Sequence, residues 1–489
     1  MSARFLALDL GAESGRAVVG EYRDARLTIR EVRRFANEPV RYNGALQWDI
    51  LRLWQEVRDS LDAVRDTRFT SVGVDAWGCD FGLLGERGNL LENPYHYRDS
   101  RTDGVMQEVT ALVSPERIYE TTGVQFLPFN TLYQLYAACQ QTPLLIDSAA
   151  SLATIPDLLN YWLTGELRSE LTIASTTQFV DPRTRDWATG LLSELSIPTR
   201  LLPPLVEPGT VLGGLCDVAS KEHSGTRVVA PACHDTGSAV ASVLAVGRTA
   251  FLSSGTWSLL GTELPGPIVS ERARVMNFTN EGGVCGTTRL LKNIAGLWLL
   301  QACRRGWSAA GYQYSYDELM LAAADDRHAF GSLVDPDCPD FLHPGDMAAS
   351  IGAFCRQTSQ AEPSGPPAYA RAVFESLAFK YRHVLEALED VTGTSFEEIR
   401  VVGGGARNRL LNQFTADATG RPVIASPVEA TALGNIAMQM IATGEVSSLD
   451  EARAVIARSF PVERYEPSNA ERWDQHYSRF REYLELTCA

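Results

Sequence analysis

Features that mark secreted and membrane proteins are missing from this sequence. No apolar run reaches the ~18 residues that a transmembrane helix needs. Asp9 interrupts the short apolar segment at the start, which argues against a secretory signal. The nine cysteines are scattered and form no Cys-x-x-Cys pair. We therefore expect a cytoplasmic protein with reduced thiols, and no disulfide framework or zinc site.

Positive charge is also scarce. Lysine and arginine number 44 against 60 aspartates and glutamates, which leaves a net charge of −16. Such a chain offers no basic surface to a nucleic acid, and it repels anionic lipid. We expect no nucleic acid or membrane partner. Phosphates can still be bound locally, by backbone N–H groups and a metal ion.

Two common nucleotide-binding motifs are absent as well. The chain contains no Walker A sequence. Its one triple-glycine run, Gly403-Gly404-Gly405, is not Gly-x-Gly-x-x-Gly, because Asn408 occupies the last position. These absences weigh against a P-loop enzyme and a dinucleotide-binding protein.

The chain of 489 residues is long enough for two domains, because a single core stops growing near ~250–300 residues. Each half opens with a strand, a turn containing glycine and serine, and a second strand. The first pair is Phe5–Leu10 with Arg16–Tyr22, and the second is Thr249–Ser253 with Thr256–Thr262. This weak internal repeat predicts an α/β protein with a boundary near Ser242–Gly247.

The remaining pattern alternates strands and helices. Further strands are expected at Leu27–Phe35, Ser71–Trp77, Phe81–Leu84 with Leu90–Leu91 across a turn, Glu398–Val402 and Val423–Ala425. Helices are expected from Ile50, over Tyr369–Val391 with Gly393 as the C-cap, over Val428–Ala442 and in the tail 469–489, with a surface loop at 362–367.

The first candidate site is Asp9-Leu10-Gly11-Ala12-Glu13-Ser14-Gly15-Arg16, where one strand ends and the next begins. Glycines let the backbone approach a phosphate, and Ser14 and Arg16 supply donors. Asp9 could hold the water shell of a magnesium ion. Taken alone, the segment is more simply a hairpin turn with a capping aspartate.

Two later loops carry similar chemistry. Ser253-Ser254-Gly255-Thr256-Trp257-Ser258 places hydroxyls and a glycine between two strands, where they could bind phosphate from the other side. The run Val401–Asn408 passes from a strand through three glycines into a helix, which allows flat contact with a nucleotide base or sugar. The loop Ser253–Ser258 alone is an ordinary turn, whereas two phosphate hairpins that face each other are a specific architecture.

A carboxylate precedes the expected boundary, in Cys233-His234-Asp235-Thr236-Gly237. Asp235 could accept a proton from an attacking hydroxyl at the mouth of an interdomain cleft. It could equally be the N-cap of the helix predicted by the apolar run Ala239–Ala245, and both roles can coexist. His234 is a rival base, although a single histidine is more often a hydrogen-bonding or core residue.

Aromatic, acidic and guanidinium groups lie together in Asp75–Phe81 and Tyr97–Arg101, a composition that suits a polyol. Taken separately, Trp77 is more simply a core residue, and Arg98 with Asp99 a surface ion pair.

In this order, the three loops and the aspartate resemble the actin-like superfamily, and within it the FGGY carbohydrate kinases. The likeness runs from about Phe5 to about Ala442. It implies two actin-like (ribonuclease H-like) α/β domains with an active-site cleft between them, residues 1–244 binding sugar and 245–489 binding ATP. Longer segments resemble the rhamnulokinase group: Asp75–Phe81, Tyr97–Thr102, Val124–Leu135, Ser253–Leu260 and Lys292–Gln301.

The resemblance also implies roles for single residues. Asp235 would be the general base that takes a proton from the C1 hydroxyl of L-rhamnulose, with ATP and Mg²⁺ as cofactors. The sugar contacts would be Gly78, Asp80, His234, Asp235, Thr236 and Asn293, of which Asp80 rests only on its charge and position. The ATP contacts would be Ala12, Glu13, Ser14, Gly15, Arg16, Thr256, Gln301 and Gly404, and Asp9 would hold the metal.

One position departs from the pattern, since Glu13 stands where enterobacterial members carry a small hydroxyl residue. A carboxylate beside phosphates must point away or meet magnesium or Arg16. Three alternatives stay open: another deoxy-ketose kinase such as L-fuculokinase, a non-catalytic actin-like protein, and a sugar-binding regulator. The regulator would need a basic DNA-binding segment, which the sequence lacks.

Overall fold

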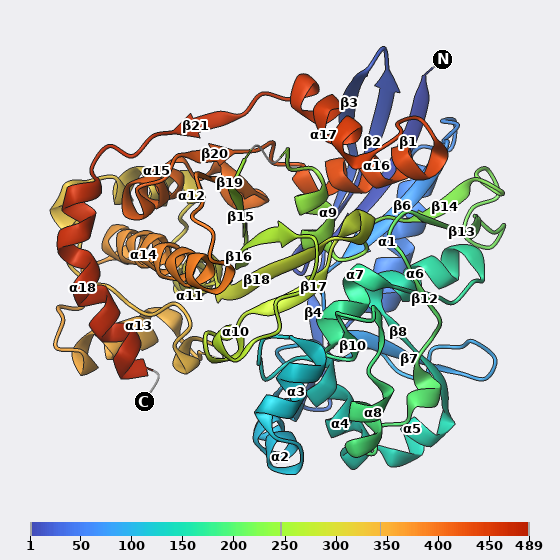
Figure 1. Ribbon diagram of the computed structural model, residues 1–489, viewed down its shortest axis with the longest axis horizontal. Helices are drawn as coiled ribbons and strands as arrows, with labels where there is room; N and C mark the ends of the chain where they lie inside the picture. Colours follow the sequence, from blue (N-terminus) through green and yellow to red (C-terminus); the bar gives the residue numbers. More distant parts are fainter. Residues whose placement is uncertain (1, 245–246, 343, 488–489) are drawn as a thin grey trace. The chain divides into compact units, whose positions relative to one another are not determined.

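The computed structural model describes residues 2–244, 247–342 and 344–487, which fall into two compact units (Figure 1). The first unit holds the chain up to Leu244 together with Glu263–Leu290 and Ala430–Phe460. The second holds the remaining stretches, including Leu291–Glu429 and the chain from Pro461. The second unit is therefore not one continuous stretch from residue 245. The expected boundary includes residues 245–246, which lie outside the described residues.

The first unit combines one large sheet with many short elements. Its strands are β1 (Ala3–Leu10), β2 (Ser14–Arg23), β3 (Arg26–Ala36), β4 (Pro39–Tyr42), β5 (Ala45–Trp48), β6 (Ser71–Ala76), β7 (Phe81–Gly85), β8 (Ala149–Thr154), β9 (Ser169–Glu170), β10 (Val180–Asp181), β11 (Asp186–Trp187), β12 (Leu205–Val206), β13 (Thr210–Gly214), β14 (Arg227–Ala230) and β17 (Thr279–Gly282). Its α-helices are α1 (Ile50–Asp62), α2 (Val105–Leu112), α3 (Pro115–Thr122), α4 (Thr131–Gln141), α5 (Pro143–Ser148), α6 (Ile155–Thr164), α7 (Leu171–Ala174), α8 (Thr189–Glu194), α9 (Asp235–Ala241), α10 (Glu271–Val275), α16 (Ala430–Thr443) and α17 (Leu449–Ser459). Short 3₁₀ turns are η1 (Ser100–Thr102), η2 (Ser175–Thr177), η3 (Thr199–Leu201) and η4 (Val284–Gly286).

The main sheet of this unit runs in the order β13-β14-β6-β1-β2-β3. Strand β1 is an apolar run buried on both faces apart from its second residue, as expected for a central strand. It pairs antiparallel with β2 and parallel with β6. This register places Asp9 beside Arg16 on one side and beside Asp75 on the other.

Helix α16 lies against this sheet, although it is far away in the sequence (Figure 1). Asn435 Nδ2 donates to the carbonyl of Gly73 at 3.2 Å, and Gln439 Nε2 donates to the carbonyl of Leu6 at 3.1 Å. A side chain at residue 73 would place its Cβ 2.6 Å from Asn435 Oδ1, so only glycine allows this approach. These contacts explain why residues 430–460 return to the first unit.

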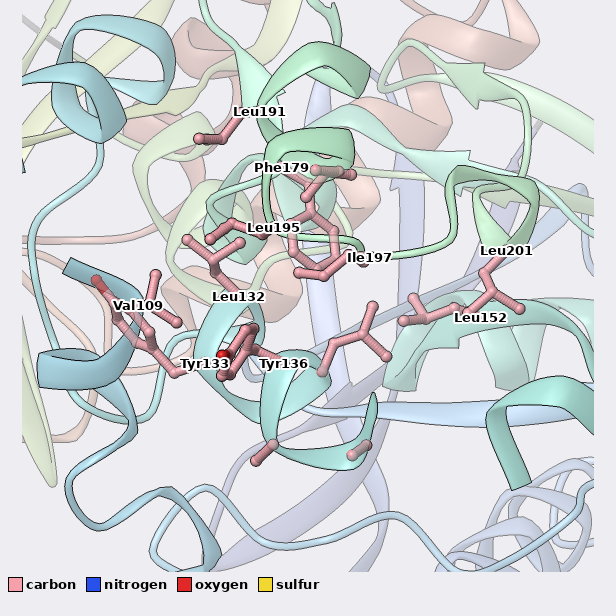
Figure 2. Packing of buried hydrophobic residues seen from close by; sticks show 14 of the residues in the cluster. Val109, Leu132, Tyr133, Tyr136, Leu152, Phe179, Leu191, Leu195, Ile197 and Leu201 are labelled. Carbon is pink, nitrogen blue, oxygen red and sulfur yellow. The ribbon is translucent and has the colours of Figure 1, made fainter. Parts of the chain in front are cut away.

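A second core of the same unit gathers around α4. Figure 2 shows Leu132, Tyr133 and Tyr136 of this helix among apolar side chains from several other elements. Those labelled with them are Val109, Leu152, Phe179, Leu191, Leu195, Ile197 and Leu201. This core supports the β7–β8 pair.

The pairing across the turn after β7 is present, but the main partner of β7 was missed. Leu90 forms an antiparallel bridge to Leu84, and Leu91 N donates to Leu83 O at 2.9 Å. Strand β7 also pairs antiparallel with β8, with Phe81 opposite Thr154. The turn expected at Gly85–Gly88 is present. Strand β8 reads Ala-Ala-Ser-Leu-Ala-Thr, and its shortage of β-branched and aromatic residues hides it from sequence analysis.

The second unit is organised around β18, β16, β15, β19, β20 and β21, which follow one another in a sheet. Strand β15 pairs antiparallel with β16 and parallel with β19, as β1 does with β2 and β6, and this agrees with the predicted repeat. The strands are β15 (Thr249–Ser254), β16 (Trp257–Leu264), β18 (Thr288–Ala295), β19 (Glu398–Val402), β20 (Val423–Ala425) and β21 (Glu463–Tyr465). The helices are α11 (Trp298–Ala309), α12 (Tyr316–Ala323), α13 (Met347–Gln357), α14 (Pro366–Thr392), α15 (Arg409–Thr419) and α18 (Ala470–Thr487), with 3₁₀ turns η5 (Asp326–His328), η6 (Pro339–Phe341) and η7 (Gly404–Arg407).

Helix α14 is the long helix of this unit, and it ends at a left-handed C-cap, Gly393, as predicted. The C-terminal helix α18 packs on it: the ring of Trp473 lies 4.8 Å from that of Phe379 on α14 and 5.2 Å from that of Phe414 on α15. The tail is thus a helix docked within the second unit. Across the described ranges, every helix is too short or too polar to span a bilayer, and the eight cysteines are free thiols.

Candidate active site

The turn between β1 and β2 is held in shape by backbone bonds. Gly11 N donates to Ser14 O at 2.9 Å, and Asn37 Nδ2 donates to Gly11 O at 2.9 Å. Gly15 is required by packing, because a Cβ there would lie 2.2 Å from the ring of Phe35. Among the five residues expected to hold phosphate, Glu13 is the exposed one. The turn is therefore rigid at its ends and open at Ala12 and Glu13.

Acidic side chains gather at the ends of β1 and β6. Burial and the neighbouring charge of Asp9 raise the pKa of Asp75 well above its usual range. Asn435 Nδ2 donates to Asp75 Oδ2 at 2.6 Å, whereas Oδ1 has no partner among the described residues. Arg16 offsets part of this charge, with Nε and Nη2 at 2.8 and 2.7 Å from Asp9 Oδ2.

Asp235 comes directly after His234, a residue that pairs with the last residue of β6. Ala76 forms a parallel bridge with His234, and α9 begins at Asp235. The expected N-cap role is corrected, since the N-cap position is His234 and Asp235 is the first helical residue. Burial raises the pKa of Asp235; the charge of Asp9 adds to this and that of His234 opposes it.

Only one oxygen of the Asp235 carboxylate contacts polar groups of the described residues. Oδ1 accepts from Thr236 N at 2.5 Å and Thr236 Oγ1 at 3.2 Å, and His234 Nε2 lies 3.5 Å away. Among the described residues, Oδ2 has no polar contact. With its side chain 30% exposed, against 8% for His234, Asp235 is the accessible carboxylate of this cluster.

Two buried acidic residues, Glu170 and Asp157, fix the backbone at Cys233 and His234, and sequence analysis did not identify them. Glu170 Oε2 accepts from Cys233 N at 2.9 Å and from Thr172 Oγ1 at 2.5 Å, and Thr172 Oγ1 accepts from His234 N at 3.1 Å. Asp157 accepts from Glu170 N at 3.2 Å. Burial raises the pKa of both carboxyls to about 7. Neither had a motif that could have revealed it.

Gly78 and the base segment are connected through α7 and η2. Thr176 Oγ1 accepts from Cys79 N at 3.2 Å, four residues after the threonine that binds His234. A Cβ on Gly78 would lie 3.0 Å from Thr176 Oγ1. The structure thus brings Gly78 into the same framework as His234, Asp235 and Thr236.

Asp80 is a buried hub. Its carboxylate accepts from Trp48 Nε1 at 2.6 Å, Trp77 Nε1 at 3.0 Å, Tyr97 N at 3.2 Å and Gln134 Nε2 at 2.9 Å. Burial raises its pKa to about 6 despite these donors. The contacts support a structural role that orients the Trp77 region, and they give no support to a direct sugar contact.

Asp99, expected with Arg98 at the surface, does not lie at the surface. Asp99 is buried, caps η1 and accepts from Leu46 N at 2.6 Å.

In the second unit, the hairpin turn of β15–β16 is locked to the start of α11. Gly296 N and Trp298 N donate to Thr256 O, both at 3.1 Å. A Cβ on Gly296 would lie 2.7 Å from Gly255 O. One turn further along α11, Gln301 has a buried Oε1 without a partner among the described residues. Thr256 and Gln301 are therefore parts of one local structure.

The triple-glycine loop packs on the same hairpin. Cβ atoms on Gly403 and Gly405 would lie 2.9 Å from Ser254 O and 2.0 Å from Ser254 Oγ, respectively, whereas one on Gly404 would meet nothing within 4 Å. Thr256, Gln301 and Gly404 thus surround one part of the second unit. Asn293, the remaining expected sugar contact, lies on β18 of the same unit, half-buried.

Comparison with known proteins agrees with these features. The profile of the FGGY family of carbohydrate kinases matches with its N-terminal domain at residues 4–242 and its C-terminal domain at 250–443. A rhamnulokinase of Bacteroides thetaiotaomicron is 42% identical over 98% of this chain and 99% of its own length, and one of Halalkalibacterium halodurans 41% over 95% and 99%.

Solved structures share the fold at low identity. A ligand-bound xylulose kinase from Lactobacillus acidophilus superposes with a TM-score of 0.82 at 16% identity, covering 100% of this chain and 99% of that one. A glycerol kinase from Plasmodium falciparum with ADP gives 0.77 at 17%, covering 100% and 98%. Together with the near-complete likeness to curated relatives, these matches show that the chain belongs to the FGGY family of carbohydrate kinases.

Proposed function

We propose that this chain is a cytoplasmic kinase of L-rhamnose catabolism. It transfers the terminal phosphoryl group of ATP to the C1 hydroxyl of L-rhamnulose, giving L-rhamnulose 1-phosphate and ADP. The named activity of relatives about 40% identical over nearly the whole chain supports the choice of sugar. The observation that carries the chemistry is Oδ2 of Asp235, an accessible carboxylate oxygen that no described residue uses.

Asp235 is the general base of this proposal. A base must lie within hydrogen-bond reach of the proton that it removes, and Oδ2 is the oxygen left for the sugar hydroxyl. The two Thr236 donors fix Oδ1 and with it the plane of the carboxylate. Its raised pKa makes it a stronger base than an ordinary aspartate. Such help is worth about 10²–10⁴-fold in rate.

The sugar contacts proposed in the first unit are Gly78, His234 and Thr236, which the α7–η2 segment ties together. The backbone N–H and the hydroxyl of Thr236 both donate to Asp235, so Thr236 orients the base and also lines the site. Asn293 of the second unit is proposed as the remaining contact. Asp80 is proposed to act behind Trp77 rather than on the sugar.

ATP is assigned to the glycine-containing turns. Residues 12–16 of the first unit are proposed to hold phosphates through backbone N–H groups and Arg16. In the second unit, the same is proposed for Thr256, with Gln301 and Gly404 against the nucleoside. The buried, unpartnered Oε1 of Gln301 and the open space over Gly404 support a ligand there.

A magnesium ion fits Asp9 by its chemistry. Asp9 Oδ2 is paired with Arg16, while Oδ1 has no polar contact within the described residues. The described residues contain no group of three acidic, histidine or cysteine ligands. This agrees with magnesium, which keeps several waters and needs only one or two carboxylates plus phosphate oxygens. When bound, the ion neutralises phosphate charge, and Asp9 would hold it in place.

The test compares initial rates with ATP and L-rhamnulose, L-fuculose, L-xylulose and glycerol. We expect the highest kcat/KM for rhamnulose. A higher value for another sugar reassigns the substrate, and ATP hydrolysis that ignores every sugar rejects a sugar kinase. In parallel, Asp235→Asn should bind the sugar in calorimetry yet lose at least ~10²-fold in kcat. Near-normal turnover would remove Asp235 from the role of base.

A further inference from the structure

The imidazole of His234 lies between two acidic side chains from different elements. Its Nδ1 is 3.1 Å from Oε2 of Glu281 on β17, and its Nε2 is 3.5 Å from Oδ1 of Asp235. The side chains of His234 and Glu281 are 8% and 5% exposed. Both nitrogens of a nearly buried ring therefore face carboxylates.

Arg289 completes this arrangement from the start of β18, which still belongs to the first unit. Its side chain is 1% exposed, and Nη2 lies 3.1 Å from Glu281 Oε2 and 3.2 Å from His234 Nδ1. Nε donates to the carbonyl of Gly282 at 3.0 Å, which fixes the guanidinium. Arg289 thus forms an ion pair with Glu281 beside the imidazole.

The charges within this group are balanced. Burial alone would raise the pKa of Glu281, but Arg289 and His234 lower it below its ordinary value, so Glu281 is an anion. Burying an ion pair costs desolvation free energy that the attraction between its members barely offsets. A chain gains little stability from such a pair, which points to a role in the neighbouring site.

The geometry restricts where the imidazole carries its hydrogens. If Arg289 donates to Nδ1, the neutral ring has its hydrogen on Nε2, toward Asp235. If Nδ1–H donates to Glu281 and the ring is protonated, Nε2 again carries hydrogen. The remaining neutral form would carry its hydrogen on Nδ1, where Arg289 Nη2 already points a donor, and would turn an Nε2 lone pair toward the Asp235 carboxylate.

We propose that Glu281 and Arg289 are positioning residues that hold His234 with an Nε2–H directed at Asp235, which keeps the base oriented and ionised. The inference rests on the proposed role of Asp235. Glu281 and Arg289 act on the base only through the imidazole. The nearby residues whose charge bears on Asp235 are His234, Asp9 and Asp75.

A double-mutant cycle tests whether Glu281 works through His234. Glu281→Gln keeps the size of the side chain and removes its charge, and we expect kcat to fall by about tenfold with a smaller change in the KM for sugar. In a His234→Asn background the same change should alter kcat by less than about twofold. An equal loss in both backgrounds would show a general structural effect and overturn the proposal.

A control makes the same Glu→Gln change at an exposed residue of the same unit. Glu207 is 58% exposed and pairs with Arg185 at 2.6 Å, and Glu207→Gln should change kcat by less than about twofold. If Glu281→Gln does not fold, the paired replacement Glu281→Gln with Arg289→Gln is measured instead, since it leaves no unpaired buried charge.

A second readout needs no substrate. Nitrogen-15 NMR of the full chain, labelled at histidine, reports which ring nitrogens carry hydrogen, and His234→Asn identifies the His234 signal. We expect hydrogen on Nε2 in the parent at neutral pH, and a change of this signal in Glu281→Gln. An Nε2 that carries no hydrogen in the parent rejects the inference. Because this result is independent of turnover, failure of the kinase assay alone would reject the proposed function and not the tautomer.

Discussion

Asp9 and Arg16 face each other across the antiparallel pair β1–β2, and two guanidinium nitrogens of Arg16 lie 2.7 and 2.8 Å from Oδ2 of Asp9. The arginine proposed for phosphate and the carboxylate proposed for magnesium are therefore already paired. Each offsets part of the charge of the other. Oδ1 of Asp9 is then the oxygen available to the cation's water shell.

Replacing Asp9 tests this arrangement. Asp9→Asn keeps the shape of the side chain but removes the charge that would hold the cation, so we expect kcat to fall by at least ~10²-fold. The Mg²⁺ concentration for half-maximal rate should rise. Asp24→Asn is the control: Asp24 is 87% exposed in the turn between β2 and β3, and its replacement should change the rate by less than about twofold. An equal loss in both variants would show that the effect is not specific to the proposed cation site.

The glycines of the third loop separate packing from ligand contact. The methyl group added by Gly404→Ala would have no atom within 4 Å, so the protein should fold with unchanged stability. The KM for ATP should rise several-fold if the nucleotide lies over this residue. Gly405→Ala would bring Cβ to 2.0 Å from Ser254 Oγ and should lower stability instead. An unchanged KM for ATP in Gly404→Ala would move the nucleotide away from the loop.

The phosphate hairpin of the second unit is held from α14. The hydroxyls of Tyr381 and Ser258 lie 2.7 Å apart, and both side chains are buried. Tyr381→Phe leaves the serine without this partner, which should cost ~1–3 kcal/mol of unfolding free energy and raise the KM for ATP.

Tyr119→Phe is the matched control for that change. It removes a buried hydroxyl that donates to Phe278 O at 2.8 Å in the first unit. We expect a similar loss of stability by urea unfolding and an unchanged KM for ATP. Equal effects of the two variants on KM would show that Tyr381 has no specific influence on the hairpin.

Local patterns predicted the framework of the site well. The apolar run before Asp9, the strand Glu398–Val402 and the helix ending at Gly393 all carry their information in neighbouring residues, namely burial on both faces and a glycine C-cap. The two hairpins were visible for the same reason. Elements of this kind need no knowledge of distant contacts.

The supporting contacts depend on long-range packing and could not be predicted. Glu281 and Arg289 reach His234 from about fifty residues away, and Asn435 reaches Asp75 across 360 positions. None of them lies in a recognisable motif. Asp80 was assigned to the sugar for its charge and position, and the four hydrogen bonds that its buried carboxylate accepts could not be predicted from neighbouring residues.

The buried carboxyl of Asp157 predicts a pH dependence of stability. Burial raises its pKa to about 7 in the folded chain, against ~3.9 when unfolded. Between these values the folded state keeps a proton that the unfolded state releases, so this group makes stability fall as pH rises from ~4 to ~7. Below ~4 the group contributes nothing, and above ~7 its full cost is present.

Asp157→Asn removes the titration, so its stability relative to the parent should increase between pH 5 and pH 8. The measurement is the midpoint of urea unfolding of both proteins at the two pH values. Any constant effect of the amide on Thr154, Ser169 and the Glu170 backbone cancels, because only the change with pH is compared. Asp62→Asn, at an exposed site on α1, should show no such change. A pH-independent difference for Asp157→Asn would mean that the buried carboxyl stays ionised throughout this range.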